Sequence, residues 1–272
     1  MSKKQVEFYR LMTEAGDRME NKEEVWQEYP RPQFVRDNWQ CLNGIWELDG
    51  SPVRVPFVPE SILSGYQGQI NTTMTYTKCF TSAKPQKNKR VLLHFGAVDQ
   101  IAEVFLNGTF LGKHAGGYAP FSFDVTEVIG EENRLEVKVT DELNKDYPYG
   151  KQCRERGGMW YTPVSGIWQS VWLEQVQETY MESVRMTPDL KGVHVQVNRV
   201  SGRIKAKSVV QAEITLHTGE NYKVDLCAED NYIDLSKIVS ASGEPYEPQL
   251  WEPANPYLYH MTLRAGEDDI QT

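Results

Sequence analysis

The residues best suited to hold a ligand lie in one stretch, KDYPYGKQCRERGGMW, at positions 145–160. It mixes aromatic rings with amide, ammonium and guanidinium groups, and sugars are commonly bound by aromatic faces together with such hydrogen-bonding groups. From this stretch we predict four substrate-binding residues: Tyr149, Lys151, Gln152 and Trp160. The alternative interpretation is a solvated loop that packs on its own tyrosines.

The histidines and cysteines predict neither a metal site nor a cofactor. None of the five histidines follows an HxH or HExxH spacing, and the four cysteines form no CxxC pair. The formal net charge of -9 opposes nucleic-acid binding. No apolar run approaches the roughly 18 residues of a membrane span, and Lys3 and Lys4 precede no secretory apolar region. We therefore expect a cytoplasmic protein with reduced thiols and with neither nucleic acid nor membrane as a partner.

The segments that would position the candidate residues have the pattern of β-strands. From Leu42 onward, short runs rich in Val, Ile, Thr and aromatic residues are separated by Gly, Pro, Asn and Asp, which is typical of a sandwich or barrel. In two runs the apolar residues fall on one parity, so that each run can bury one face. These residues are Met74, Tyr76 and Phe80, then Leu135, Val137 and Val139. Between two further runs, Asn107-Gly108 predicts a two-residue hairpin turn.

A second series of strands is predicted to begin near residues 178–184, after the run IWQSVWLEQV. Apolar residues recur with period two at 193–197 and 212–216, as an immunoglobulin-like sandwich requires. We expect the tryptophans within or beside strand patterns to bury large apolar areas in the cores. They are Trp46, Trp168, Trp172 and Trp251, the last of which would seal the second sandwich.

The two ends of the chain differ from this pattern. Residues 3–28 predict a short amphipathic helix, which Pro30 and Pro32 would stop. At the other end, the chain stops shortly after an acidic turn at 266–269, as if inside a strand. We expect a truncated final strand that leaves its neighbour an unpaired edge.

Three motifs together resemble the N-terminal half of family-two glycoside hydrolases, the family of bacterial β-galactosidases, β-glucuronidases and β-mannosidases. The first, NGTFLGKHAGGYAPFSFDVTEVI, contains a hairpin and a Gly-Gly-Tyr-x-Pro-Phe loop. The second, GGMWYTPVSGIWQSVWLE, contains a Ser-Gly-Ile-aromatic core before a strand, and the third, LWEPANPYLY, resembles the segment that closes the family's second domain. Their order and spacing agree with the family over residues 31–272.

The resemblance implies an all-β fold of a jelly-roll sandwich followed by an immunoglobulin-like sandwich. The expected domains are a helical extension at 1–30, a sugar-binding-like jelly roll at 31–180 and an immunoglobulin-like sandwich at 181–272. In the family, the catalytic glutamates lie on a (β/α)8 barrel of about 250 further residues. A retaining glycosidase needs two carboxylates about 5 Å apart, and none of the 38 acidic residues is singled out as such a pair. We therefore predict no catalytic residue in this chain.

The resemblance also points to Asn71 as a sugar contact. Aligned on its tyrosine, INTTMTYTKCF places Asn71 where the β-galactosidase branch has a pocket asparagine, and an amide can both donate to and accept from a hydroxyl. Alternatively, Asn71 only begins a strand. The branch's pocket aspartate has no counterpart, because Gly157, Gly158 and Met159 precede Trp160. A strict galactoside pocket is therefore not expected.

The leading hypothesis is a non-catalytic region of a β-glycoside hydrolase, which shapes the substrate cleft, packs against the barrel and could support homo-oligomer formation. The alternatives are a stand-alone carbohydrate-binding module and a purely structural pair of sandwiches, since jelly rolls host many functions. Galactoside, glucuronide and mannoside all remain open as substrates.

Overall fold

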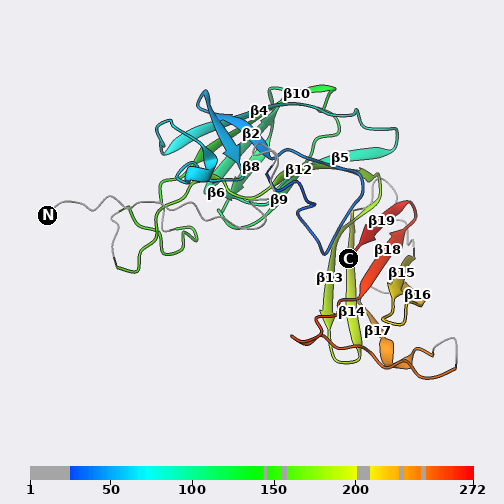
Figure 1. The fold of residues 1–272 in the computed structure, drawn as a ribbon. Coiled ribbons are helices and arrows are strands. Elements are labelled where there is room, and N and C mark those ends of the chain that lie inside the picture. Colours follow the sequence, from blue (N-terminus) through cyan, green and yellow to red (C-terminus); the bar gives the residue numbers. More distant parts are fainter. Residues whose placement is uncertain (1–24, 144–145, 155–157, 201–208, 227–229, 240–242) are drawn as a thin grey trace.

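The computed structural model describes residues 25–143, 146–154, 158–200, 209–226, 230–239 and 243–272. Within these residues the chain forms two β-sandwiches, one built from strands between residues 39 and 177 and one from strands between residues 180 and 271 (Figure 1). The expected all-β fold is confirmed. The helix predicted at 3–28 falls almost wholly outside the described residues. No helix among the described residues is long and apolar enough to cross a membrane.

The first sandwich packs a six-stranded sheet, ordered β3-β2-β4-β10-β7-β8, against a four-stranded sheet, ordered β1-β12-β5-β9, with a short β11-β6 pair beside them. A 3-10 turn, η1, covers Ile62–Ser64. The strands are β1 (Trp39–Cys41), β2 (Gly44–Leu48), β3 (Ser51–Val55), β4 (Thr73–Thr81), β5 (Lys89–Phe95), β6 (Val98–Asp99), β7 (Ile101–Leu106), β8 (Thr109–Ala115), β9 (Phe121–Asp124), β10 (Glu132–Thr140), β11 (Gly166–Ile167) and β12 (Val171–Gln177).

The core of this sandwich follows the predicted alternation. Tyr76 and its partner Val137 are paired across β4 and β10 and are both fully buried. Each alternate residue of these strands faces the second sheet because successive side chains of a strand point to opposite faces. The predicted hairpin is also confirmed: β7 and β8 are joined by Asn107 and Gly108, which have φ values of 52° and 81°. Both residue types tolerate this left-handed conformation.

The second sandwich packs the sheet β13-β14-β17 against the sheet β16-β15-β18-β19. A second 3-10 turn, η2, covers Leu235–Lys237. The strands are β13 (Tyr180–Pro188), β14 (Gly192–Val200), β15 (Val210–Thr215), β16 (Asn221–Leu226), β17 (Asp230–Asp234), β18 (His260–Ala265) and β19 (Asp268–Gln271). The last strand, β19, pairs with β18 along its whole length.

The segment that precedes β1 contacts both sandwiches. Phe34 is buried in the core of the second sandwich, and Val35 exchanges backbone hydrogen bonds of 2.8 and 3.0 Å with Gln271 of β19. Four residues after Val35, at Trp39, the chain joins the first sandwich as β1. We call residues 29–36 the strap.

The tryptophan expectations hold in part. Trp46 and Trp172 are buried, but Trp251 is 59% exposed, so its expected role as the seal of the second sandwich is wrong. Glu252 and Asn255 exchange backbone hydrogen bonds and close a tight turn immediately after Trp251. Tyr246 takes the interior position instead, because its hydroxyl has partners there: it bonds His217 Nδ1 at 2.7 Å and the Tyr259 hydroxyl at 2.9 Å.

Candidate functional site

The candidate site lies at one end of the six-stranded sheet. Thr73 opens β4 opposite Thr140, which closes β10, and Thr140 pairs in turn with Ile101 at the start of β7. The segments that precede Thr73 and Ile101 and the segment that follows Thr140 therefore lie at the same end of the sheet. We call this region the loop end; its functional groups come from Asp99, the 116–120 turn, the 141–165 loop and Glu60.

Gln152 organises the long loop of this region. Its Oε1 accepts the Val164 amide at 2.7 Å, and its Nε2 donates to the Tyr118 hydroxyl at 3.1 Å. The same side chain hydrogen-bonds the Asp99 carboxyl, and only 9% of Gln152 is exposed. Gln152 thus ties the loop to β6 and to the 116–120 turn. Its side-chain amide is largely buried among these protein partners.

The backbone of the loop folds back beside Gln152. The Tyr161 amide donates to the Lys151 carbonyl at 2.7 Å, and the Cys153 amide donates to the Tyr161 carbonyl at 3.1 Å. This ladder brings Trp160 beside Lys151, although eight residues separate them in the chain. Trp160 is 45% exposed, and Lys151 is also exposed. Both residues are therefore accessible to solvent on the same loop.

The remaining two predicted residues lie nearby without a comparable link. Tyr149 is half-buried in the same loop. Asn71 is exposed and precedes Thr72, whose carbonyl accepts the Asp141 amide at 2.8 Å. The structure therefore places all five predicted residues at the loop end and joins Lys151, Gln152 and Trp160 through one loop.

Sequence reasoning missed a cluster of three carboxyls at the same end. Glu60 accepts the Ser165 hydroxyl at 2.7 Å and the Ser165 amide at 3.2 Å. Burial, followed by repulsion from Asp141 and Glu60, raises the pKa of Asp99 to about 7. Burial also raises the pKa of Glu60 and of Asp141, and Arg154 opposes the rise at Asp141.

The sequence carries little signal for this cluster because the three acids are far apart in the chain and share no spacing. Their proximity arises from the pairing of β6 with β11, which places Asp99 opposite Gly166, the neighbour of Ser165. No group of three metal-binding side chains that could hold an ion occurs among the described residues.

The groups at the loop end can hydrogen-bond and stack, the two interactions that a polyhydroxylated ligand offers. A carboxyl with a pKa near neutrality can act as hydrogen-bond donor or acceptor at physiological pH. Aromatic groups frame it: Trp168 donates to the Gly117 carbonyl at 2.7 Å, and the Tyr118 and Trp168 rings meet edge to face at 5.8 Å. Flat rings flanked by amides and carboxyls fit the alternating apolar and hydroxyl faces of sugars.

A hollow of about 1000 Å³ lies elsewhere, on the second sandwich, between His217 and the 245–252 segment. It contains the exposed Trp251 but none of the predicted site residues. We place the candidate site at the loop end because the predicted residues and the buried carboxyls coincide there.

The fold defines a class of protein, a tandem of two β-sandwiches. The chain matches two family models, "Glycosyl hydrolase 2 galactose-binding domain-like" over residues 56–188 and "Glycosyl hydrolases family 2" over residues 179–272. The chain belongs to glycoside hydrolase family 2, as its three motifs predicted.

Its relatives include enzymes with two different names. A β-galactosidase of Thermoanaerobacter pseudethanolicus is 29% identical over 201 residues, which cover 72% of this chain and 26% of the relative. A β-glucuronidase of Formosa agariphila is 28% identical over 227 residues, which cover 75% of this chain and 23% of the relative. The solved structure of a β-glucuronidase from an uncultured Clostridium species aligns with a TM-score of 0.64 at 25% identity. The alignment covers 87% of this chain and 44% of that structure's chain. The chain thus spans about a quarter of the length of these curated relatives.

Proposed function

We propose that this chain is the non-catalytic N-terminal region of a hydrolase acting on β-glycosides, and that its loop end forms part of the substrate-binding surface. The observation that carries the proposal is the convergence of Gln152, Trp160 and Asp99 at one end of a sandwich that belongs to this family. The names of the relatives support a β-galactoside or β-glucuronide as substrate.

Each residue has a role set by its exposure. The accessible indole of Trp160 would stack on the apolar face of a sugar ring, while Lys151 and Asn71 would reach hydroxyl or carboxylate groups. Tyr149 would contribute from the same loop. Gln152 is largely occupied by protein partners, so it would mainly hold the loop in its binding shape.

Hydrolysis itself is assigned to residues outside this chain. The relatives are about four times as long as the matched region, and the two sandwiches would pack against a (β/α)8 barrel that carries the catalytic carboxylates. In this proposal the chain alone is inactive, works in the cytoplasm, and needs neither metal nor cofactor. Assembly of the whole enzyme into a homo-oligomer is compatible with it.

The test is a panel of chromogenic β-galactoside, β-glucuronide and β-mannoside substrates. It compares this chain with the longest natural reading frame that contains it. Activity confined to the longer protein is the expected result. Hydrolysis by the 272-residue chain alone would overturn the assignment of chemistry to another domain.

Trp160→Ala in the longer protein should raise KM about tenfold or more, because ring stacking on a sugar is lost. Trp251→Ala is the matched control, since that indole is also exposed but lies on the other sandwich. Equal effects of the two substitutions on KM would contradict a role for the loop end.

The exposed rings of Trp160 and Tyr161 favour one alternative, a module that binds sugar by itself. Isothermal titration of this chain with galactose, glucuronic acid and mannose distinguishes the two functions. Binding that Trp160→Ala abolishes, together with an inactive longer protein, would replace the proposed function by the stand-alone module.

A further inference from the structure

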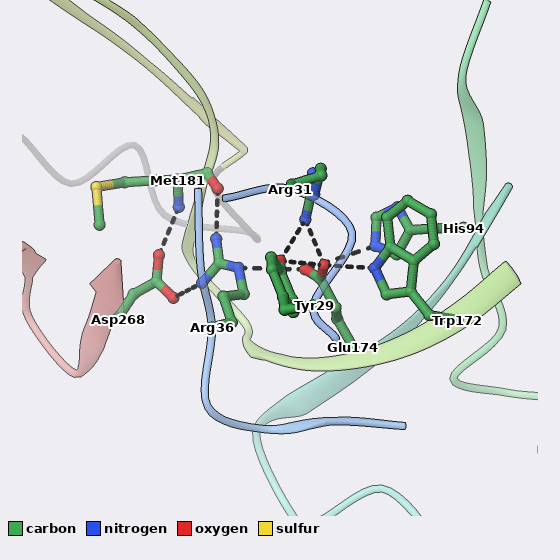
Figure 2. A network of polar contacts seen from close by, with 8 residues as sticks. All are labelled: Tyr29, Arg31, Arg36, His94, Trp172, Glu174, Met181 and Asp268. Carbon is green, nitrogen blue, oxygen red and sulfur yellow. Dashed lines mark hydrogen bonds and ion pairs between the residues drawn. The ribbon is translucent and has the colours of Figure 1, made fainter. Parts of the chain in front are cut away.

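The Arg36 guanidinium lies between the two sandwiches and contacts both (Figure 2). On the first sandwich, its Nε lies 3.3 Å from Oε2 of Glu174 in β12. On the second, Nη1 pairs with the Asp268 carboxylate of β19, and Nη2 donates to the Met181 carbonyl of β13 at 2.6 Å. Arg36, Glu174 and Asp268 are 5%, 1% and 3% exposed, so this contact is removed from solvent.

The second carboxylate oxygen of Glu174 holds the start of the strap. Oε1 accepts the Tyr29 hydroxyl at 2.6 Å and the Trp172 indole N–H at 2.7 Å, and it also accepts from Arg31 (Figure 2). His94 and Arg31, followed by the hydrogen bonds from Tyr29 and Trp172, lower the pKa of Glu174 against the effect of burial. One carboxylate of the first sandwich therefore fixes both arginines of the strap.

The apolar side of the strap is fixed on the second sandwich. Phe34 is buried in that core, and the Arg31 and Arg36 guanidinium carbons lie 4.9 and 5.2 Å from its ring centroid. Asp268 completes the arrangement, because its Oδ2 accepts the Met181 amide at 2.7 Å. Arg36 and Asp268 thus bind the carbonyl and the amide of Met181, the second residue of β13.

These contacts can form only at one angle between the two sandwiches. The direct link between β12 and β13 is only residues 178–179, and a short link alone permits many angles between domains. Rotation about it would separate the Arg36 guanidinium from Glu174 or from Asp268, and a buried charge left without its partner is strongly unfavourable. Guanidinium–carboxylate pairs also have strict geometry.

We propose that the strap is an interdomain clamp and that Arg36 is the positioning residue that sets the angle between the two sandwiches. The clamp orients the loop end relative to the second sandwich whatever ligand the loop end binds. This inference is independent of the proposed function.

The main test removes the positive charge of Arg36 from the full chain by substitution with methionine. In Arg36→Met we expect the maximum dimension from small-angle X-ray scattering to increase and the calorimetric unfolding to split into two transitions, because domains without a fixed interface unfold separately. Hydrogen exchange at the Met181 amide should accelerate about tenfold or more. A scattering profile and a single transition equal to wild type would overturn the proposal.

A double variant, Arg36→Met with Asp268→Asn, covers the case in which the single variant fails to fold. It removes one charge of each sign, and Glu174 keeps Tyr29, Trp172 and Arg31 as partners. We expect it to fold with the two sandwiches uncoupled. The matched control is Arg90→Met, which breaks an ion pair of 2.8 Å to Asp124 within the first sandwich and should leave scattering unchanged.

The wild-type chain supplies a check that needs no variant. Residual dipolar couplings measured on the two sandwiches should fit a single relative orientation. A broad distribution of orientations in the wild-type protein would contradict the clamp, even if both variants fail to fold.

Discussion

Two buried carboxyls at the two ends of the first sandwich, Glu174 and Asp99, have pKa shifts of opposite direction. At the clamp, Glu174 is surrounded by Arg31, Arg36 and hydrogen-bond donors, and its pKa is lowered. At the loop end, Asp99 is next to other acids, and its pKa is raised to about 7. A charge paired with opposite charges holds its neighbours in one geometry. A carboxyl that lies close to other acids can instead bind a proton or a hydrogen-bonding ligand near neutral pH.

This difference separates structural from functional polar groups. Most polar atoms of the clamp residues contact protein partners, which leaves these residues little exposed surface to offer a ligand. The loop end keeps exposed rings and a carboxyl poised near neutrality. Burial alone would not distinguish the two regions, because Asp99 and Asp268 are each 3% exposed.

The largest effect is expected from Glu174→Ala. The substitution leaves the buried Arg36 with one carboxylate instead of two and removes a partner from Arg31 and Tyr29. Breaking a buried ion pair from one side costs about 3–5 kcal/mol of unfolding free energy, measurable as a shift in the urea midpoint. Lys113→Met is the control: its ion pair with Glu103 is exposed, and such pairs contribute about 0–1 kcal/mol. Equal losses in the two variants would remove the contrast between the clamp and an ordinary surface pair.

An intermediate, pH-dependent effect is expected from Asp99→Asn. The folded-state pKa of Asp99, about 7, lies above its ordinary value of 3.8, so the folded protein binds the proton more tightly than the unfolded chain. This contribution to stability is present at low pH and is lost as pH rises through 7. Relative to wild type, Asp99→Asn should therefore gain on the order of 2–4 kcal/mol between pH 4 and pH 8.

Urea titrations of Asp99→Asn and wild type across that range provide the measurement. Glu103→Gln, which changes an exposed carboxyl on β7, is the control. A stability difference between Asp99→Asn and wild type that stays constant with pH would show that Asp99 does not carry a raised pKa.

The sequence was informative where a local pattern determines the structure. Alternation predicted the buried faces of β4 and β10, and Asn107-Gly108 predicted the turn between β7 and β8. It was less informative for polar groups brought together by sheet pairing. Asp99 and Glu174 are separated by 75 positions and belong to opposite ends of the fold, and nothing local to either residue predicts its neighbours.

Tryptophan shows the same limit. Trp172 and Trp251 both lie beside apolar residues in the sequence, yet the structure buries the first and exposes the second. Trp172 is in a strand whose neighbours cover both faces, whereas Trp251 precedes a tight turn outside the sheets. The apolar character of tryptophan predicts burial, but whether the residue lies within a strand or next to a turn decides whether it is buried.

The smallest effect, with the opposite pH dependence, is expected from His94→Phe. Burial lowers the pKa of His94 from 6.5 to about 4, against the attraction of Glu174. The unfolded chain therefore binds this proton first as pH falls, and wild-type stability should decline between pH 6.5 and pH 4. Phenylalanine can keep the stacking on Trp172, whose ring centroid lies 4.9 Å from that of His94, and it cannot be protonated.

His94→Phe should accordingly lose less stability than wild type over that interval, by on the order of 1–3 kcal/mol. Thermal unfolding followed by near-ultraviolet circular dichroism at pH 4.5, 5.5 and 6.5 would measure the difference. The two pH effects run in opposite directions: protonation favours the folded state at Asp99 and opposes it at His94. If both substitutions changed the pH slope with the same sign, either the raised pKa of Asp99 or the lowered pKa of His94 would be wrong.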